Sequence, residues 1–154
     1  MYDLIIPSEV ITGIEICLSL LPPSTSLEST AMLPASHYLR AQRTADWHVQ
    51  VELLKVPPVA STPATATVHA KIVRIFRATR PITLGEELTF GVSVIRPCDE
   101  MPASETIWTD YDYLTFSRFM EVFLNSKKQL PHCEVALWQS RLIDQPSDKP
   151  CMAL

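Results

Sequence analysis

Alternation of apolar and polar side chains, interrupted by prolines, is the feature that most constrains how this chain can fold. From Trp47 to Leu53 every second side chain is apolar, and His48, Gln50 and Glu52 lie between them. Successive side chains of a strand point to opposite faces, so a period of two is typical of a β-strand with one buried face and one face in water. A pair of prolines then ends the predicted strand.

The same period recurs along the chain and predicts further strands. Between residues 66 and 76 the apolar side chains change parity, because Val73 and Ile75 lie on the face opposite to Val68. One extra residue in a strand has this effect, so we expect a β-bulge near Ile72. The other predicted strands cover residues 13–20, 88–94, 120–124 and 133–143.

An aromatic-rich segment, residues 106–119, follows a different period. Bulky side chains recur there at spacings of three and four, as on one face of a helix, and Ser104 or Thr106 can cap its first turn. We expect its aromatic side chains to fill one open end of a small barrel, with a ligand cage or a partner surface as the alternative. They are Trp108, Tyr111, Tyr113, Phe116 and Phe119. For residues 33–43 the composition leaves both a short helix and a loop open.

From Trp47 onward, the predicted order is three strands, one helix and two strands. This is the order of elements in oligonucleotide/oligosaccharide-binding (OB) barrels, which are closed or partly open sheets of five strands. The predicted fold class is therefore mainly β, a small five- to six-stranded OB-like barrel with one helix between the third and fourth barrel strands.

Two short stretches between Ala70 and Leu88 read Ala-Lys-Ile-Val-Arg-Ile-Phe-Arg and Leu-Gly-Glu-Glu-Leu. They resemble the corresponding hairpin of netrin-like modules. The resemblance covers only part of the chain, and it implies the same barrel and a protein partner. The N-terminal Cys-x-Cys of the protease-inhibiting members is absent, so the resemblance does not imply protease inhibition.

The length of 154 residues, with 47% hydrophobic side chains, suits one domain. We expect a single domain over residues 1–154, with the barrel in residues 46–145. Residues 1–45 are predicted to be an N-terminal strand and loop extension. Residues 146–154, which contain two prolines, are predicted to be a loose tail.

Glycine and cysteine usage argues against several kinds of site. The chain has 3 glycines and neither a G-x-G-x-x-G nor a G-x-x-x-x-G-K-[ST] motif, so we expect no phosphate-binding loop and no cofactor. Its 4 cysteines include no Cys-x-x-Cys pair, which is typical of reduced thiols and of a cytoplasmic protein. No apolar run is long enough for a membrane helix. The formal charge of −4 gives no overall attraction to nucleic acid or to an anionic membrane.

Side chains with metal-binding or catalytic chemistry are poorly placed to act together. His48 and His69 lie too far apart on the predicted hairpin to share an ion, and the neighbours His132 and Cys133 would point to opposite faces of a strand. We therefore expect no metal site. Cys98 is followed by two carboxylates, which is the wrong electrostatic environment for a thiolate nucleophile.

Five residues are the candidates for binding a partner. Four are basic and recur every three residues through the second strand, so they alternate between its faces and do not form one patch. The fifth is a tryptophan in the last strand, off the parity of its apolar neighbours, and we expect it to be an exposed contact aromatic. The candidates are Lys71, Arg74, Arg77, Arg80 and Trp138.

These observations predict a non-catalytic binding or protein-interaction module whose partner is a protein or a small ligand. One alternative is a single-stranded nucleic-acid-binding OB-type domain that uses the arginines of the second strand. The other is an enzyme with Cys98, Asp99 or Asp110 in a pocket beside the helix. The sequence predicts neither the oligomeric state nor the identity of the partner.

Overall fold

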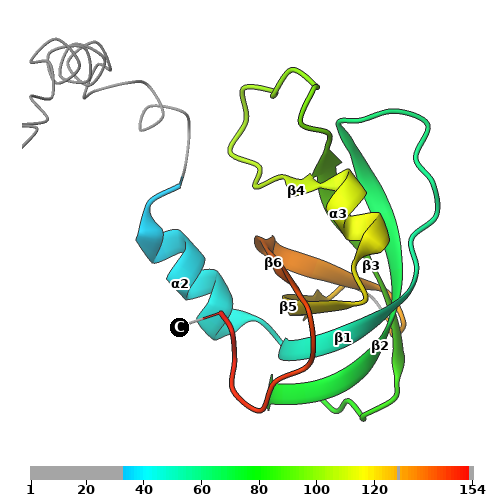
Figure 1. The fold of residues 1–154 in the computed structure, drawn as a ribbon. Coiled ribbons are helices and arrows are strands. Elements are labelled where there is room, and N and C mark those ends of the chain that lie inside the picture. Colours follow the sequence, from blue (N-terminus) through cyan, green and yellow to red (C-terminus); the bar gives the residue numbers. More distant parts are fainter. Residues whose placement is uncertain (1–32, 128, 153–154) are drawn as a thin grey trace, which may run out of the picture. The chain divides into compact units, whose positions relative to one another are not determined.

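One curled sheet organises the part of the chain described by a computed structural model, which comprises residues 33–127 and 129–152 (Figure 1). The sheet has 6 strands in the order β4-β3-β2-β1-β5-β6. The strands are β1 (Trp47–Lys55), β2 (Ala64–Ala78), β3 (Glu87–Ile95), β4 (Thr109–Asp110), β5 (Phe119–Ser126) and β6 (Cys133–Ile143), and the helices are α2 (Ala35–Thr44) and α3 (Tyr111–Phe116). The strand predicted over residues 13–20 lies outside the described residues.

The sheet curls into a half-barrel, which brings β3 close to the start of β6. Strand β3 runs parallel to the start of β6, with a bridge between Thr89 and His132. The N–H of Thr89 donates a hydrogen bond to the carbonyl of Pro131 at 2.8 Å. Apart from the two-residue strand β4, the order is three strands, helix α3 and two strands. The predicted fold class, a mainly β OB-like sheet with one helix between its third and fourth long strands, is confirmed.

The core lies inside the curl and follows the predicted alternation. Every second side chain of β1, β2, β3 and β5 points inward and is shielded from solvent. Burial of these apolar surfaces is the main contribution to the stability of the sheet. The core side chains include Trp47, Val49, Val51, Val68, Ile72, Leu88, Phe90, Tyr111, Leu114, Met120, Val122 and Leu124.

A bulge bends β2 where the sequence predicted one. Gln50 pairs with Arg74 and Val51 pairs with Ile72, so Val73 has no partner on β1. The extra residue explains the change of parity in the apolar pattern. The predicted bulge near Ile72 is confirmed.

Helix α3 is shorter than the sequence predicted and has a different cap. Asp110 caps it, because its Oδ1 accepts the N–H groups of Asp112 and Tyr113 at 2.9 and 3.3 Å. The predicted caps Ser104 and Thr106 lie in a loop before β4, and Phe119 already belongs to β5. The helix is confined to six residues because the chain on either side pairs as strand.

Only part of the predicted aromatic plug faces the core. Tyr111 is buried, and together with Leu114 it closes one end of the half-barrel. Tyr113 and Phe116 point outward and are 70% and 89% exposed, which corrects the expectation that they are core residues. With only six residues, the helix presents one short face to the core.

The outward face of β1 is not solvated, contrary to the prediction. His48 and Gln50 are buried. Helix α2 covers this face at one end, and residues 146–152, which we name the C-terminal strap, cover it around Gln50 (Figure 1). Glu52 stays partly exposed and pairs with Lys71 and Arg118. The sequence left helix and loop open for residues 33–43, and the structure places a helix there.

Candidate binding groove and buried polar network

A groove crosses the outer surface of the barrel where β3 meets β6. One hollow of about 420 Å³ and a second of about 220 Å³ share Gly91, Lys127 and Cys133, so they form one continuous depression. We name this depression the β3–β6 groove. Its lining comes from β2, β3, β6 and the turn between β5 and β6, and comprises Thr65, Thr67, Thr89, Phe90, Gly91, Ser93, Lys127, His132, Cys133, Glu134, Val135 and Trp138.

Small side chains on β2 and β3 keep the groove open. Thr65 and Thr67 point outward from β2, opposite Ser93 and Gly91 on β3. A Cβ atom added at Gly91 would lie 2.7 Å from Cγ2 of Thr65, which is closer than two carbon atoms can pack. An alanine at this position therefore requires the exposed side chain of Thr65 to move.

Trp138 reaches the groove through an irregular stretch of β6. Val122 pairs with Ser140 and Leu124 pairs with Val135, so the residues between Val135 and Ser140 oppose a single residue of β5. Within this irregular stretch Leu137 and Trp138 have φ angles of 42° and 57°. Positive φ costs a non-glycine residue on the order of 1–2 kcal/mol, and bulges are a means of redirecting side chains. The chain thus tolerates strain to place an aromatic ring at the groove.

Cys133 lines the groove as a buried, unreactive thiol. Burial raises the pKa of Cys133 to about 11, and the negative charges of Glu86 and Asp46 act in the same direction. The thiolate is the nucleophilic form of cysteine. The groove therefore contains no activated thiol at this position.

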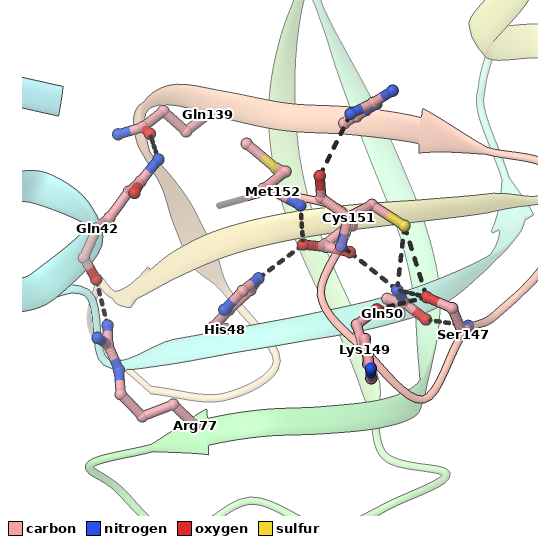
Figure 2. Close-up of polar contacts among 11 residues, drawn as sticks. Gln42, His48, Gln50, Arg77, Gln139, Ser147, Lys149, Cys151 and Met152 are labelled. Atoms are coloured by element: carbon pink, nitrogen blue, oxygen red, sulfur yellow. Dashed lines mark hydrogen bonds and ion pairs between the residues drawn. The ribbon is translucent and has the colours of Figure 1, made fainter. Parts of the chain in front are cut away.

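A buried glutamate lies elsewhere on the outward face of the sheet, at the centre of β5. Both carboxylate oxygens of Glu121 are occupied: Oε1 accepts from Nε2 of His48 and Oε2 accepts from Nε2 of Gln50, each at 2.8 Å. The N–H groups of Met152 and Cys151 complete the set, again at 2.8 Å (Figure 2). Four hydrogen-bond donors thus surround the carboxylate of Glu121, and none of them is a lysine or an arginine.

These hydrogen bonds determine the charge state of the carboxylate. Burial alone would raise the pKa of Glu121, but the hydrogen bonds from Gln50, Cys151, Met152 and His48 outweigh burial and hold the pKa below its ordinary value. Burial lowers the pKa of His48, although Glu121 opposes this change. At neutral pH the site therefore holds a charged glutamate and a neutral histidine.

Two aromatic rings pack against the histidine. The ring of His48 stacks on Phe123 with a centroid distance of 4.0 Å, and Phe76 lies at 5.0 Å in a tilted arrangement. Phe123 also packs with Ala136 in a small second core that Met152 contacts. This packing fixes the imidazole that donates to Glu121.

The four basic candidates do not converge. Lys71 forms an ion pair with Glu52 at 3.7 Å, Arg74 with Asp148 at 2.9 Å, and Arg80 with Asp46 at 3.4 Å. Arg77 donates to the carbonyls of Gln42 and Ala45 and so caps the end of α2. The prediction that the basic side chains alternate between the faces of the strand is wrong: Lys71, Arg74 and Arg77 pair with Glu52, Gln50 and His48, and register shifts between them place all three on the outward face. The fifth candidate, Trp138, lies in the groove.

The carboxylates nominated for an enzymatic site have structural contacts. Asp99 accepts a hydrogen bond from the hydroxyl of Thr62, and this bond, with another from the N–H of Arg96, lowers the pKa of Asp99. Asp110 caps α3. Cys98 is an exposed free thiol. Among residues 33–127 and 129–152, no three His, Cys, Asp or Glu side chains are grouped so that they could hold a metal ion.

Sequence reasoning missed the Glu121 network and most of the groove. A signal for the groove was present, since small side chains occupy alternate outward positions in residues 65–67 and 91–93. For Glu121 the only signal was a polar residue at an outward position of a central strand, and a solvated face gives the same pattern.

Comparison of the sequence with models of known protein families finds no match, and neither does comparison with curated proteins. In the part of the chain that the structure describes, neither helix is long and apolar enough to cross a membrane.

Proposed function

We propose that this protein is a non-catalytic binding module that holds its ligand in the β3–β6 groove. The observation that carries the proposal is the position of the groove. It lies over the outward faces of the second and third barrel strands and beside the turn that precedes the last strand. OB-type barrels bind their ligands on this surface and its adjoining loops.

The asymmetry of the outer surface supports the same site. Helix α2 and the C-terminal strap cover the outward face of β1 and β5. Among the described residues, none fills the hollow of about 420 Å³ over β2 and β3. Ligand sites of proteins commonly have volumes of about 300–1,000 Å³.

The chemistry of the lining favours a ligand with little net charge that has both polar and apolar parts. Hydroxyl groups of threonine and serine line the β2 and β3 side, and each can donate and accept a hydrogen bond. Apolar surface predominates in the larger hollow, and Trp138 offers an aromatic surface at the other end. Lys127 and Glu134 add one charge of each sign. A small molecule of this kind, or a similar segment of a protein partner, suits this lining.

The two alternatives have less support. A nucleic-acid site needs free cationic side chains along the strand, and Lys71, Arg74 and Arg80 are each paired with a carboxylate. An enzymatic site would use Asp99 or Asp110, and both are engaged within their own loops. A cytoplasmic location is part of the proposal, and the free thiols of Cys98, Cys133 and Cys151 support a reducing compartment.

Mapping by NMR tests the proposal. ¹⁵N-labelled protein is titrated separately with a library of small fragments, a mixture of neutral oligosaccharides and a mixed-sequence single-stranded oligonucleotide. We expect the amide signals that shift to cluster on Thr67, Thr89, Gly91 and Trp138. Shifts confined to the surface around Arg74 with the oligonucleotide would favour the nucleic-acid alternative, and turnover of a probe would favour an enzyme.

A further inference from the structure

The C-terminal strap is bound to the sheet through four main-chain hydrogen bonds and several side-chain contacts. The N–H groups of Cys151 and Met152 donate to Glu121, and the carbonyl of Cys151 accepts from Arg141 at 3.3 Å. The N–H of Ser147 donates to Oε1 of Gln50 at 2.9 Å. These contacts would be made by many sequences, because every residue except proline carries the same main-chain groups.

Three side chains from three adjacent strands provide these contacts. Gln50 projects from β1, Glu121 from β5 and Arg141 from β6, and in the register of the sheet Glu121 lies beside both of the others. We name these three residues the strap slot. Figure 2 shows Ser147 beside Gln50, and Cys151 and Met152 close by.

Side-chain contacts also hold the strap and give the slot some selectivity. Asp148 of the strap forms an ion pair with Arg74 of β2 at 2.9 Å, and Sγ of Cys151 lies 4.0 Å from Nε2 of Gln50. The hydroxyl of Ser147 accepts from Nε2 of Gln50 at 3.0 Å. Met152 packs against the small core of Phe123 and Ala136. The slot thus suits a small polar residue at one end of a short extended segment and an apolar residue at the other.

Loss of the strap would remove two of the four donors to Glu121. The carboxylate forms no hydrogen bond or ion pair with Arg141, which donates instead to the strap carbonyl. Water would replace the lost donors, so the N–H groups of the strap contribute the net gain of a protein donor over water. A segment that presents two successive N–H groups could make the same hydrogen bonds to Glu121.

We propose that the strap slot is a second binding site, one that recognises the main chain of an extended peptide, and that the C-terminal strap occupies it in cis. The site is separate from the β3–β6 groove and does not depend on the function proposed for the groove. A tethered strap has an effective concentration in the millimolar range. An outside peptide therefore enters the slot when the strap is weakened or displaced.

A trans-binding experiment with the full chain tests this site. The double variant Cys151→Pro and Met152→Pro removes both N–H donors to Glu121, because proline has no N–H. The probe is a fluorescent synthetic peptide with the sequence of residues 145–154, kept reduced, and binding is followed by fluorescence anisotropy. We expect the peptide to bind the double variant about tenfold or more tightly than it binds the wild-type chain, in which the strap competes.

Matched controls make the result specific. A peptide carrying the same two prolines is expected to bind the double variant about tenfold more weakly, because it lacks the donors to Glu121. Arg141→Ala in the double variant is expected to weaken binding severalfold, and Arg141 is an exposed residue whose loss leaves the core intact. If the double variant does not fold, Met152→Pro alone carries the same comparison.

Three outcomes would overturn the proposal. They are equal binding of the peptide to the variant and the wild-type chain, no binding to a variant whose NMR spectrum shows an intact barrel, and equal binding of the proline-containing peptide. Each would mean that the strap is only a structural cover for Glu121.

Discussion

Oε1 of Glu121 and Nε2 of His48 lie 2.8 Å apart at a place where neither side chain reaches solvent. The pair joins the two central strands β1 and β5 on their outward face, where the sequence indicated contact with water. Its neighbours Gln50, Cys151 and Met152 complete the hydrogen bonds of the carboxylate. Glu121 thus holds the C-terminal strap to the sheet.

Replacing this carboxylate is expected to cost stability. Glu121→Gln introduces an NH₂ group among four donors, so at least one donor loses its acceptor. We expect the free energy of unfolding to fall by about 2–4 kcal/mol. Urea denaturation measures this change, with Glu105→Gln in an exposed loop as the control. An equal, small effect of both substitutions would show that the network does not stabilise the fold.

The same pair predicts loss of stability in acid. The pKa of His48 is lowered in the folded chain, so the unfolded chain binds a proton more readily below the ordinary value of 6.5, and stability falls as the pH drops below it. The pKa of Glu121 is also lowered, so its contribution is present above the ordinary value of 4.5 and is lost as the pH falls further. Urea midpoints measured from about pH 8 to pH 4 test this, and His48→Gln is expected to flatten the first part of the curve. A wild-type midpoint that stays constant down to about pH 5 would contradict the expected role of His48.

Gly91 provides a test of the groove wall. Gly91→Ala places a methyl group against Cγ2 of Thr65, and we expect a loss of about 1–2 kcal/mol in the free energy of unfolding. Thr65→Ser in the same chain removes that methyl group of Thr65 and should restore most of the loss. If the second substitution restores nothing, the close approach of β2 and β3 is not as described.

The thiols are expected to differ in reactivity. Because the pKa of Cys133 is raised to about 11, roughly one molecule in a thousand carries its thiolate at pH 8. Cys98 and Cys151 are exposed. Alkylation with iodoacetamide followed by peptide mass spectrometry should modify these two in the native protein and Cys133 only after unfolding. Alkylation of native Cys133 at the rate of Cys98 would contradict its burial.

Local patterns predicted the strands well, because the alternation of apolar and polar residues that is typical of a strand can be seen in neighbouring residues. The alternation from Trp47 gives the first residue of β1, and the change of parity after Val68 gives the bulge at Val73. Alternation reports which side chains share a face. It does not report which of two faces another segment covers.

That limit explains the main errors. His48 and Gln50 have the pattern of a solvated face and are buried by segments at both ends of the described chain. Residues 146–154 were predicted to be a loose tail because they contain Pro146 and Pro150. The N–H groups of Cys151 and Met152 nevertheless donate to Glu121, which is in place only when β5 has formed. Contacts between segments far apart in sequence leave no local signature. Trp138 was nominated by its parity, and whether it binds a partner stays a prediction.

The most direct test of the central claim is to block the β3–β6 groove without disturbing the barrel. Thr67 is exposed in the groove, and Ser104 is exposed in the loop before β4 and is not among the residues that line the groove, so Thr67→Trp and Ser104→Trp add nearly the same bulk at the two places. The affinity of both variants for the tightest probe found by NMR is measured by isothermal titration calorimetry. We predict that Thr67→Trp weakens binding about tenfold or more while Ser104→Trp retains the wild-type affinity. Equal affinities for the two variants would show that the ligand does not bind in the groove.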